Sequence, residues 1–270
     1  MMLNPSISLI VPGIRTQNWQ KLYEEAKEAC SKFSYELILI GPKPLPSFFD
    51  DKDEVRYIKC HSSPSVSLMN AVSICRGEYF TWILDDADLK KDSIDSALNV
   101  MKDEKDETIM FTRYVERENG QENETPNFIQ AWTHNDLKLP LIQKDWKIAP
   151  VMLLKTSFFK QLGGIDCVYE HINASILDFN FRAQMNGSKL IPSPQLIMSC
   201  ELQRNRTVDN NPIIQAWFEN DKPILTKNYS EPGNVEVLID YDNWLEFPSV
   251  WPRKKKIIES GQYFIGDQES

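Results

Sequence analysis

Three carboxylates follow directly on an apolar run in the first third of the chain. Residues 79–84 are apolar or β-branched, and Asp85, Asp86 and Asp88 come next. A short run of this kind is typical of a buried parallel strand, and ligands of open α/β sheets collect beyond the carboxyl ends of such strands. Mg²⁺ is typically held by one or two carboxylates together with substrate phosphates. The segment therefore indicates a metal–diphosphate site, with a solvated acidic turn or the N-cap of a following helix as the alternative.

The composition of the chain limits which ligands such a site could bind. The chain has 270 residues, of which 41% are hydrophobic and 26% charged, with a net charge of −9. This size allows one large core with a smaller appended region. The negative charge argues against binding nucleic acid, but it permits an anionic small ligand held through a metal. Five cysteines without a close CxxC pair are typical of a reducing compartment. With no leader pattern and no apolar run of membrane length, the sequence predicts a cytoplasmic protein with at most peripheral membrane association.

Alternating strand and helix patterns would position the acidic segment. Strands are expected where short apolar runs end at Gly or Pro, and helices where apolar residues recur every three or four positions. Such alternation predicts right-handed βαβ units and a mostly parallel sheet. The expected strands are 7–11, 35–40, 55–58, 79–84, 108–114 and 149–154, and the expected helices are 19–33, 65–75, 92–101, 156–162 and 176–185.

Three separated blocks, together covering about residues 6–192, resemble the family-2 glycosyltransferases with the GT-A fold. The first is the opening strand and loop, with Arg15 and Trp19. The second is a helix at 65–72, a Gly-Glu-Tyr strand and a DxD motif. The third is a Gly-Gly-Ile-Asp block followed by the helix that contains Asp178 and Arg182.

The resemblance implies a GT-A type, Rossmann-like, mostly parallel sheet flanked by helices, with an acceptor-side region and an irregular C-terminal extension. Residues 1–200 would form the glycosyltransferase domain, with a nucleotide-binding half at about 1–115 and an acceptor half at about 116–200. Residues 201–270 would form the extension, a lid and tail. The implied reaction is metal-dependent, inverting transfer from a UDP- or GDP-type nucleoside-diphosphate sugar to a hydroxyl of a carbohydrate or lipid-linked acceptor, as in polysaccharide or glycoconjugate synthesis.

The same resemblance assigns roles to the carboxylates. Asp86 and Asp88 would hold Mn²⁺ or Mg²⁺, and Asp85 would support them. Inversion requires a general base on the face opposite the leaving group, and Asp178 takes that role. The structural alternative for Asp178 is a stabilising place near a helix N-terminus, paired with Arg182 four residues on. Asp166 and Glu170 are the substitutes for the base.

Other residues are expected around the nucleotide. Each has a structural alternative: a surface cation for the arginines, a tight loop for Gly41-Pro42 and a buried polar helix residue for Asn70. Beyond the sheet, Arg204 and Arg206 would close a lid over the diphosphate. The nucleotide-binding residues are Pro12, Gly13, Arg15, Gly41, Pro42, Asn70 and Asp86.

Several positions depart from the family pattern. Leu39-Ile40-Gly41-Pro42 replaces an aspartate pair that reads the uracil base, and no histidine follows His171 to complete a metal site. Two other functions remain open. A sugar nucleotidyltransferase would show a glycine-rich basic loop after the first strand, whereas residues 11–15 contain one glycine and one cation. A catalytically degenerate nucleotide- or carbohydrate-binding protein would keep the fold without the transfer.

Overall fold

The computed structural model describes residues 4–118, 121–123, 129–130, 139–143, 145–201, 212–254 and 256. A seven-stranded sheet lies at its centre, in the order β12-β6-β11-β4-β1-β2-β3. β1 pairs in parallel with β2 and β4, β2 with β3, and β12 with β6, while β11 is antiparallel to both of its neighbours. The predicted mixed α/β architecture with a mostly parallel sheet is confirmed. The strands are β1 Ile7–Pro12, β2 Tyr35–Gly41, β3 Val55–Lys59, β4 Tyr79–Trp82, β6 Ile109–Phe111, β11 Met152–Lys155 and β12 Leu190–Pro192.

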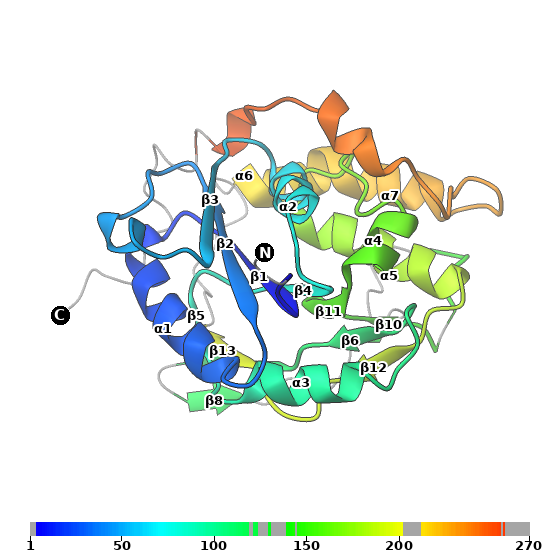
Figure 1. The fold of residues 1–270 in the computed structure, drawn as a ribbon. Coiled ribbons are helices and arrows are strands. Elements are labelled where there is room, and N and C mark those ends of the chain that lie inside the picture. The colour runs from blue at the N-terminus through cyan, green and yellow to red at the C-terminus, as the bar shows by residue number, and fades with distance from the viewer. Residues whose placement is uncertain are drawn as a thin grey trace.

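Helices cover both faces of this sheet. Figure 1 shows α1 and α3 on one side and α2, α4 and α5 on the other. α1 buries one apolar stripe, which includes Trp19, Leu22 and Ala26, as its helical periodicity predicts. α2 begins at Pro64 because the hydroxyl of Ser63 accepts a hydrogen bond from the amide of Val66. The bounds are α1 Trp19–Ala29, α2 Pro64–Ser73, α3 Ser93–Met101, α4 Thr156–Gln161 and α5 Ile172–Met185, with 3₁₀ turns at Thr16–Asn18 and Ser47–Phe49.

A second, smaller sheet extends beyond the carboxyl ends of β4 and β6. Its order is β5-β13-β7-β8, and a separate two-stranded sheet joins β9 and β10. The single expected strand at 108–114 is divided into β6 and β7, because Ser193 accepts the amide of Arg113 and its own amide donates to Phe111. The bounds are β5 Ala87–Leu89, β7 Tyr114–Glu118, β8 Gln121–Asn123, β9 Ile129–Gln130, β10 Lys147–Ile148 and β13 Met198–Glu201.

The described part of the C-terminal extension contains helices, which the expectation of an irregular extension did not include, while residues 229–240 form neither helix nor strand. It contains α6 Pro212–Ala216, a π-helical turn Trp217–Asp221, α7 Lys222–Asn228 and a 3₁₀ helix Tyr241–Glu246. Leu225 and Tyr229 are fully buried against Tyr169 and Phe181, in a cluster separate from the main core. Within the described residues, no helix is long and apolar enough to cross a membrane.

A buried glutamate ties the amino ends of the central strands together. Glu36 on β2 accepts hydrogen bonds from the hydroxyl of Ser8 (2.6 Å), the amide of Arg76 (2.7 Å) and the Nε of Arg76 (2.8 Å). Burial acts to raise the pKa of Glu36, but these donors and the charge of Arg76 outweigh it, so the pKa lies below its ordinary value of 4.5.

This carboxylate is expected to make stability depend on pH. Because its folded-state pKa is lowered, its contribution is fully present above about pH 4.5 and is lost as the pH falls through the folded-state pKa. Urea unfolding at about pH 6 and about pH 3 should therefore show Glu36→Gln clearly less stable than wild type at the higher pH, with a smaller deficit at the lower pH. An equal deficit at both pH values would contradict this contribution.

Candidate functional site

The acidic segment lies at the carboxyl edge of the large sheet. The parallel ladder of β4 continues past its end, since the amide of Ile83 donates to the carbonyl of Ile10 at 2.8 Å. The chain then turns through Asp85 and Asp86 and enters β5, which places Asp88 in the smaller sheet. The predicted position beyond a buried strand is confirmed. Asp85 and Asp86 share Arg15 as a partner, whereas Asp88 faces Lys21 and Arg117.

Asp85 anchors the loop that follows β1. Its Oδ2 accepts the amides of Ile14 (2.9 Å) and Arg15 (3.0 Å), and its Oδ1 lies 2.5 Å from Nη1 of Arg15. The side-chain amide of Asn18 also donates to its carbonyl at 2.9 Å. These contacts fix Asp85 to the β1 loop. They also explain Gly13, since a Cβ there would lie 2.5 Å from the Cβ of Asp85.

Gly41 lies directly beside this loop. A Cβ on Gly41 would stand 2.1 Å from the carbonyl oxygen of Gly13, while the amide of Gly13 donates to Ile40 and the carbonyl of Gly41 accepts from Cys60. Pro42 is buried. The ends of β1, β2 and β4 are thus packed backbone against backbone. The residues predicted to surround a nucleotide, Pro12, Gly13, Arg15, Gly41 and Pro42, are brought together at one edge.

Asn70 is placed differently from the other predicted nucleotide contacts. It lies in the second half of α2 and is partly exposed, and its carbonyl accepts the hydroxyl of Ser73 at 2.7 Å. No side-chain hydrogen bond joins it to the carboxyl-edge residues within the described chain. Arg204 and Arg206, the expected lid arginines, lie outside the described residues.

Asp86 and Asp88 face cations of the protein. Oδ2 of Asp86 lies 3.5 Å from Nη1 of Arg15. Asp88 forms ion pairs with Lys21 of α1 and Arg117 of β7. Burial acts to raise the pKa of Asp88, but hydrogen bonds and charge from both cations outweigh it and the pKa is lowered. Neither Lys21 nor Arg117 was among the residues singled out from the sequence, because both are far from Asp88 along the chain.

These residues do not fit the expected Mn²⁺ or Mg²⁺ site. A Mg²⁺ ion is held at about 2.0–2.1 Å by one or two carboxylates, whose oxygens must be available to bind it. Here Asp85 points into the β1 loop, Asp86 faces Arg15 and Asp88 is held between two cations. In the part of the chain that the structure describes, no cluster of three or more His, Cys, Asp or Glu residues could hold a metal ion.

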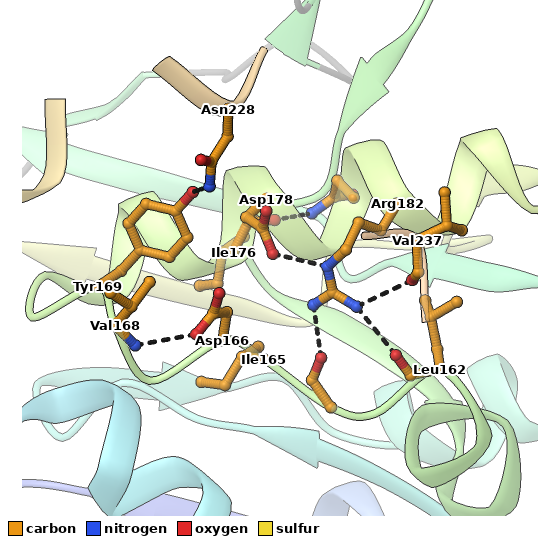
Figure 2. Close-up of polar contacts among 12 residues, drawn as sticks. Leu162, Ile165, Asp166, Val168, Tyr169, Ile176, Asp178, Arg182, Asn228 and Val237 are labelled. Atoms are coloured by element: carbon orange, nitrogen blue, oxygen red, sulfur yellow. Dashed lines mark hydrogen bonds and ion pairs between the residues drawn. The ribbon is translucent and has the colours of Figure 1, made fainter. Parts of the chain in front are cut away.

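Asp178, the predicted general base, lies in a buried polar cluster on α5 (Figure 2). It is 3% exposed. Its Oδ2 accepts the Nε of Arg182 at 2.7 Å and its Oδ1 accepts the hydroxyl of Tyr229 at 2.9 Å. The contacts are those of the structural alternative, the ion pair at i and i+4. Both carboxylate oxygens are engaged inside the protein, so Asp178 as placed does not present one to an acceptor hydroxyl.

Arg182 extends this cluster to neighbouring loops. Its guanidinium donates to the carbonyls of Leu162 (2.9 Å), Gly164 (2.6 Å) and Val237 (3.4 Å). Figure 2 labels Leu162 and Val237 beside it. It thereby ties the Gly-Gly turn to α5 and to the C-terminal segment. The role of Tyr229 was not predicted from the sequence, because this residue directly follows α7, in the extension that was expected to be irregular. Burial and the charge of Asp178 raise its pKa well above 10.0, so the phenol stays protonated and donates.

The two substitute bases are also placed. Oδ1 of Asp166 accepts the amide of Val168 at 3.0 Å, and no hydrogen bond to its Oδ2 is present among the described residues. Burial, together with the charge of Asp178, raises the pKa of Asp166 above its ordinary value of 3.8. Glu170 pairs with Arg253 at 2.9 Å. Asp166 is therefore the less engaged of the two by hydrogen bonds and ion pairs.

Comparison with known proteins adds no family. No protein-family model matches the chain, and no curated protein matches it either.

Proposed function

We propose that this protein binds a nucleoside-diphosphate sugar of the UDP or GDP type at the carboxyl edge of its large sheet. We further propose that it transfers the sugar, with inversion, to a hydroxyl of a carbohydrate or lipid-linked acceptor, as a divergent family-2 glycosyltransferase of GT-A type. One observation carries the proposal. The β1 loop, the end of β2 and the acidic segment, far apart in sequence, converge at the edge where open α/β sheets bind ligands.

The proposed reaction is a single in-line displacement. The acceptor oxygen forms a bond to the anomeric carbon while the bond from that carbon to the diphosphate oxygen breaks, and its electron pair leaves with the diphosphate. A carboxylate takes the proton of the acceptor hydroxyl. Asp166 is the candidate for this step, because its Oδ2 is not engaged by the described residues and its pKa is raised.

A second candidate function is a binding protein that has kept the nucleotide edge and lost the transfer. The engagement of both oxygens of Asp178 in a buried ion pair and a phenol hydrogen bond favours it. In this case the carboxyl edge of the large sheet would bind a nucleotide sugar, and the buried cluster around Asp178 and Arg182 would only stabilise the fold.

Two measurements test these proposals. Calorimetric titration with UDP, GDP and other nucleoside diphosphates should show saturable binding to one or more of them, and binding to none would contradict both candidates. Donor turnover is then measured with the matching nucleotide sugars. Asp166→Asn should leave nucleotide affinity unchanged and reduce transfer by about 10²–10⁴-fold, because it removes a proton acceptor.

The control variant is Asp51→Asn, which removes an exposed carboxylate that pairs with Lys52 and should alter neither quantity. Normal transfer by Asp166→Asn would show that another group accepts the proton. Nucleotide binding without any turnover in wild type would favour the binding protein over the transferase.

A further inference from the structure

The acidic segment 85–88 is matched by cations that belong to the chain itself. We propose that Arg15, Lys21 and Arg117 pair with the carboxylates of this segment in place of a divalent metal ion, so that the protein binds no such ion there. The consequence that donor binding is independent of metal rests on the proposed function, whereas the statement about the ion does not.

Hydrogen bonds fix both ends of the segment. At one end, Asp85 is fixed by the amides of Ile14 and Arg15 and by the side chain of Asn18. At the other end, Asp88 lies in β5, opposite Ser199 in the antiparallel pairing with β13. The amide of Leu89, the next residue, donates to Glu25 of α1 at 2.8 Å. Because both ends are bonded to different elements, the segment is fixed in place beside the cations of the protein.

The three cations come from three separate elements. Arg15 follows β1 and lies within 4 Å of both Asp85 and Asp86. Lys21 on α1 and Arg117 on β7 reach Asp88 from two sides. A divalent ion entering this segment would have to displace these groups from their carboxylates and would be repelled by their charges at short range. The internal ion pairs therefore compete directly with a metal ion.

This arrangement also removes the usual need for a metal. Three unpaired carboxylates at the edge would repel an incoming diphosphate, and a divalent ion would be required to offset that repulsion. Since each of the three carboxylates here faces a protein cation, the acidic charge is largely balanced before any ligand arrives. A nucleoside diphosphate then meets an edge that is not strongly negative.

The test measures binding of Mn²⁺ alone, from the loss of the electron paramagnetic resonance signal of the free ion. Wild type should bind no Mn²⁺ at this segment below about 1 mM. Lys21→Gln/Arg117→Gln, which removes both partners of Asp88, should gain Mn²⁺ affinity by about tenfold or more. Tight binding by wild type that is lost in Asp86→Asn would overturn the proposal. No gain in the double variant would overturn the role of these cations.

A charge-matched control is Lys27→Gln/Lys52→Gln. It also removes two positive charges, but from pairs with Glu24 and Asp51 that do not touch the segment, and it should gain no Mn²⁺ affinity. Folding of each variant is checked by circular dichroism. If the first double variant unfolds, Lys21→Gln alone replaces it, because the Lys21 side chain is 59% exposed.

The second part of the test measures the affinity for UDP and for GDP under two conditions. One contains Mn²⁺ and the other contains a chelator. The two affinities should agree within about threefold, and a rise of about tenfold or more with Mn²⁺ would overturn metal independence. If no nucleotide binds in either condition, the proposed function fails, while the measurements with Mn²⁺ alone still decide whether the segment holds a metal.

Discussion

Replacement of Asp178 by alanine is expected to lower the free energy of unfolding by about 3–5 kcal/mol, because it leaves the guanidinium of Arg182 buried without a counter-ion. Arg182 is 1% exposed and Asp178 3% exposed, so the guanidinium is not in contact with bulk water. The phenol of Tyr229 also loses its acceptor. Urea unfolding monitored by circular dichroism measures the change.

Two further variants separate the structural role of Asp178 from a catalytic one. Asp178→Asn keeps the shape and an acceptor for Tyr229, yet it places a neutral amide against Nε of Arg182, so it should also be clearly destabilised. Asp166→Asn is the matched control. Because the pKa of Asp166 is raised, its charge is unfavourable in the folded state near neutral pH, and the variant should be as stable as wild type or slightly more so. Wild-type stability in Asp178→Asn would refute the structural role.

Local sequence patterns predicted the centre of the fold. The strands β1, β2 and β4 are short apolar runs that end near Gly, Pro or Asp, and such runs form buried parallel strands whatever surrounds them. The stripe of α1 was equally clear, although the helix ends at Ala29 and not at the expected residue 33. These features depend on residues close together in the chain, which is why periodicity finds them.

Features that depend on distant partners were not predicted. α5 begins at Ile172, four residues before the expected start, because buried Asp221 accepts the amides of Glu170 and His171 just ahead of the helix. The antiparallel direction of β11 and the strand β5 likewise follow from pairing with remote segments. The spacing of apolar residues within one segment carries no information about its contacts with distant segments.

The candidate site shows the same division. The sequence placed the acidic segment and the two loops at one edge, since the carboxyl ends of parallel strands meet there. It could not show which way adjacent carboxylates point. Asp85 and Asp88 are three residues apart, yet one faces the β1 loop and the other faces α1 and β7. Their chemistry is set by cations about 30 to 70 positions away in the chain, which spacing alone does not reveal.

Replacement of Gly41 by alanine is expected to destabilise the carboxyl edge by about 3 kcal/mol or more, at the upper end of the cost of overpacking. The added Cβ would lie 2.1 Å from the carbonyl oxygen of Gly13, which is backbone and cannot rotate away. Relief would require β2 to move from the β1 loop, and that movement would disturb the amides that Ile14 and Arg15 donate to Asp85. Denaturant unfolding measures the loss, and nucleotide titration should show weakened binding, because the proposed donor edge is the part displaced.

The control is Gly233→Ala. A Cβ there meets nothing within 4 Å, but the residue has a φ of +93°, so the variant should lose only the cost of a left-handed backbone, about 1–2 kcal/mol, and keep nucleotide affinity. This glycine is needed for backbone conformation, whereas Gly41 is needed for close approach of two strand ends. If Gly41→Ala were no more destabilising than Gly233→Ala, the packing of β2 against the β1 loop would be looser than the structure shows. Unchanged nucleotide binding in a destabilised Gly41→Ala would instead move the proposed donor site away from this edge.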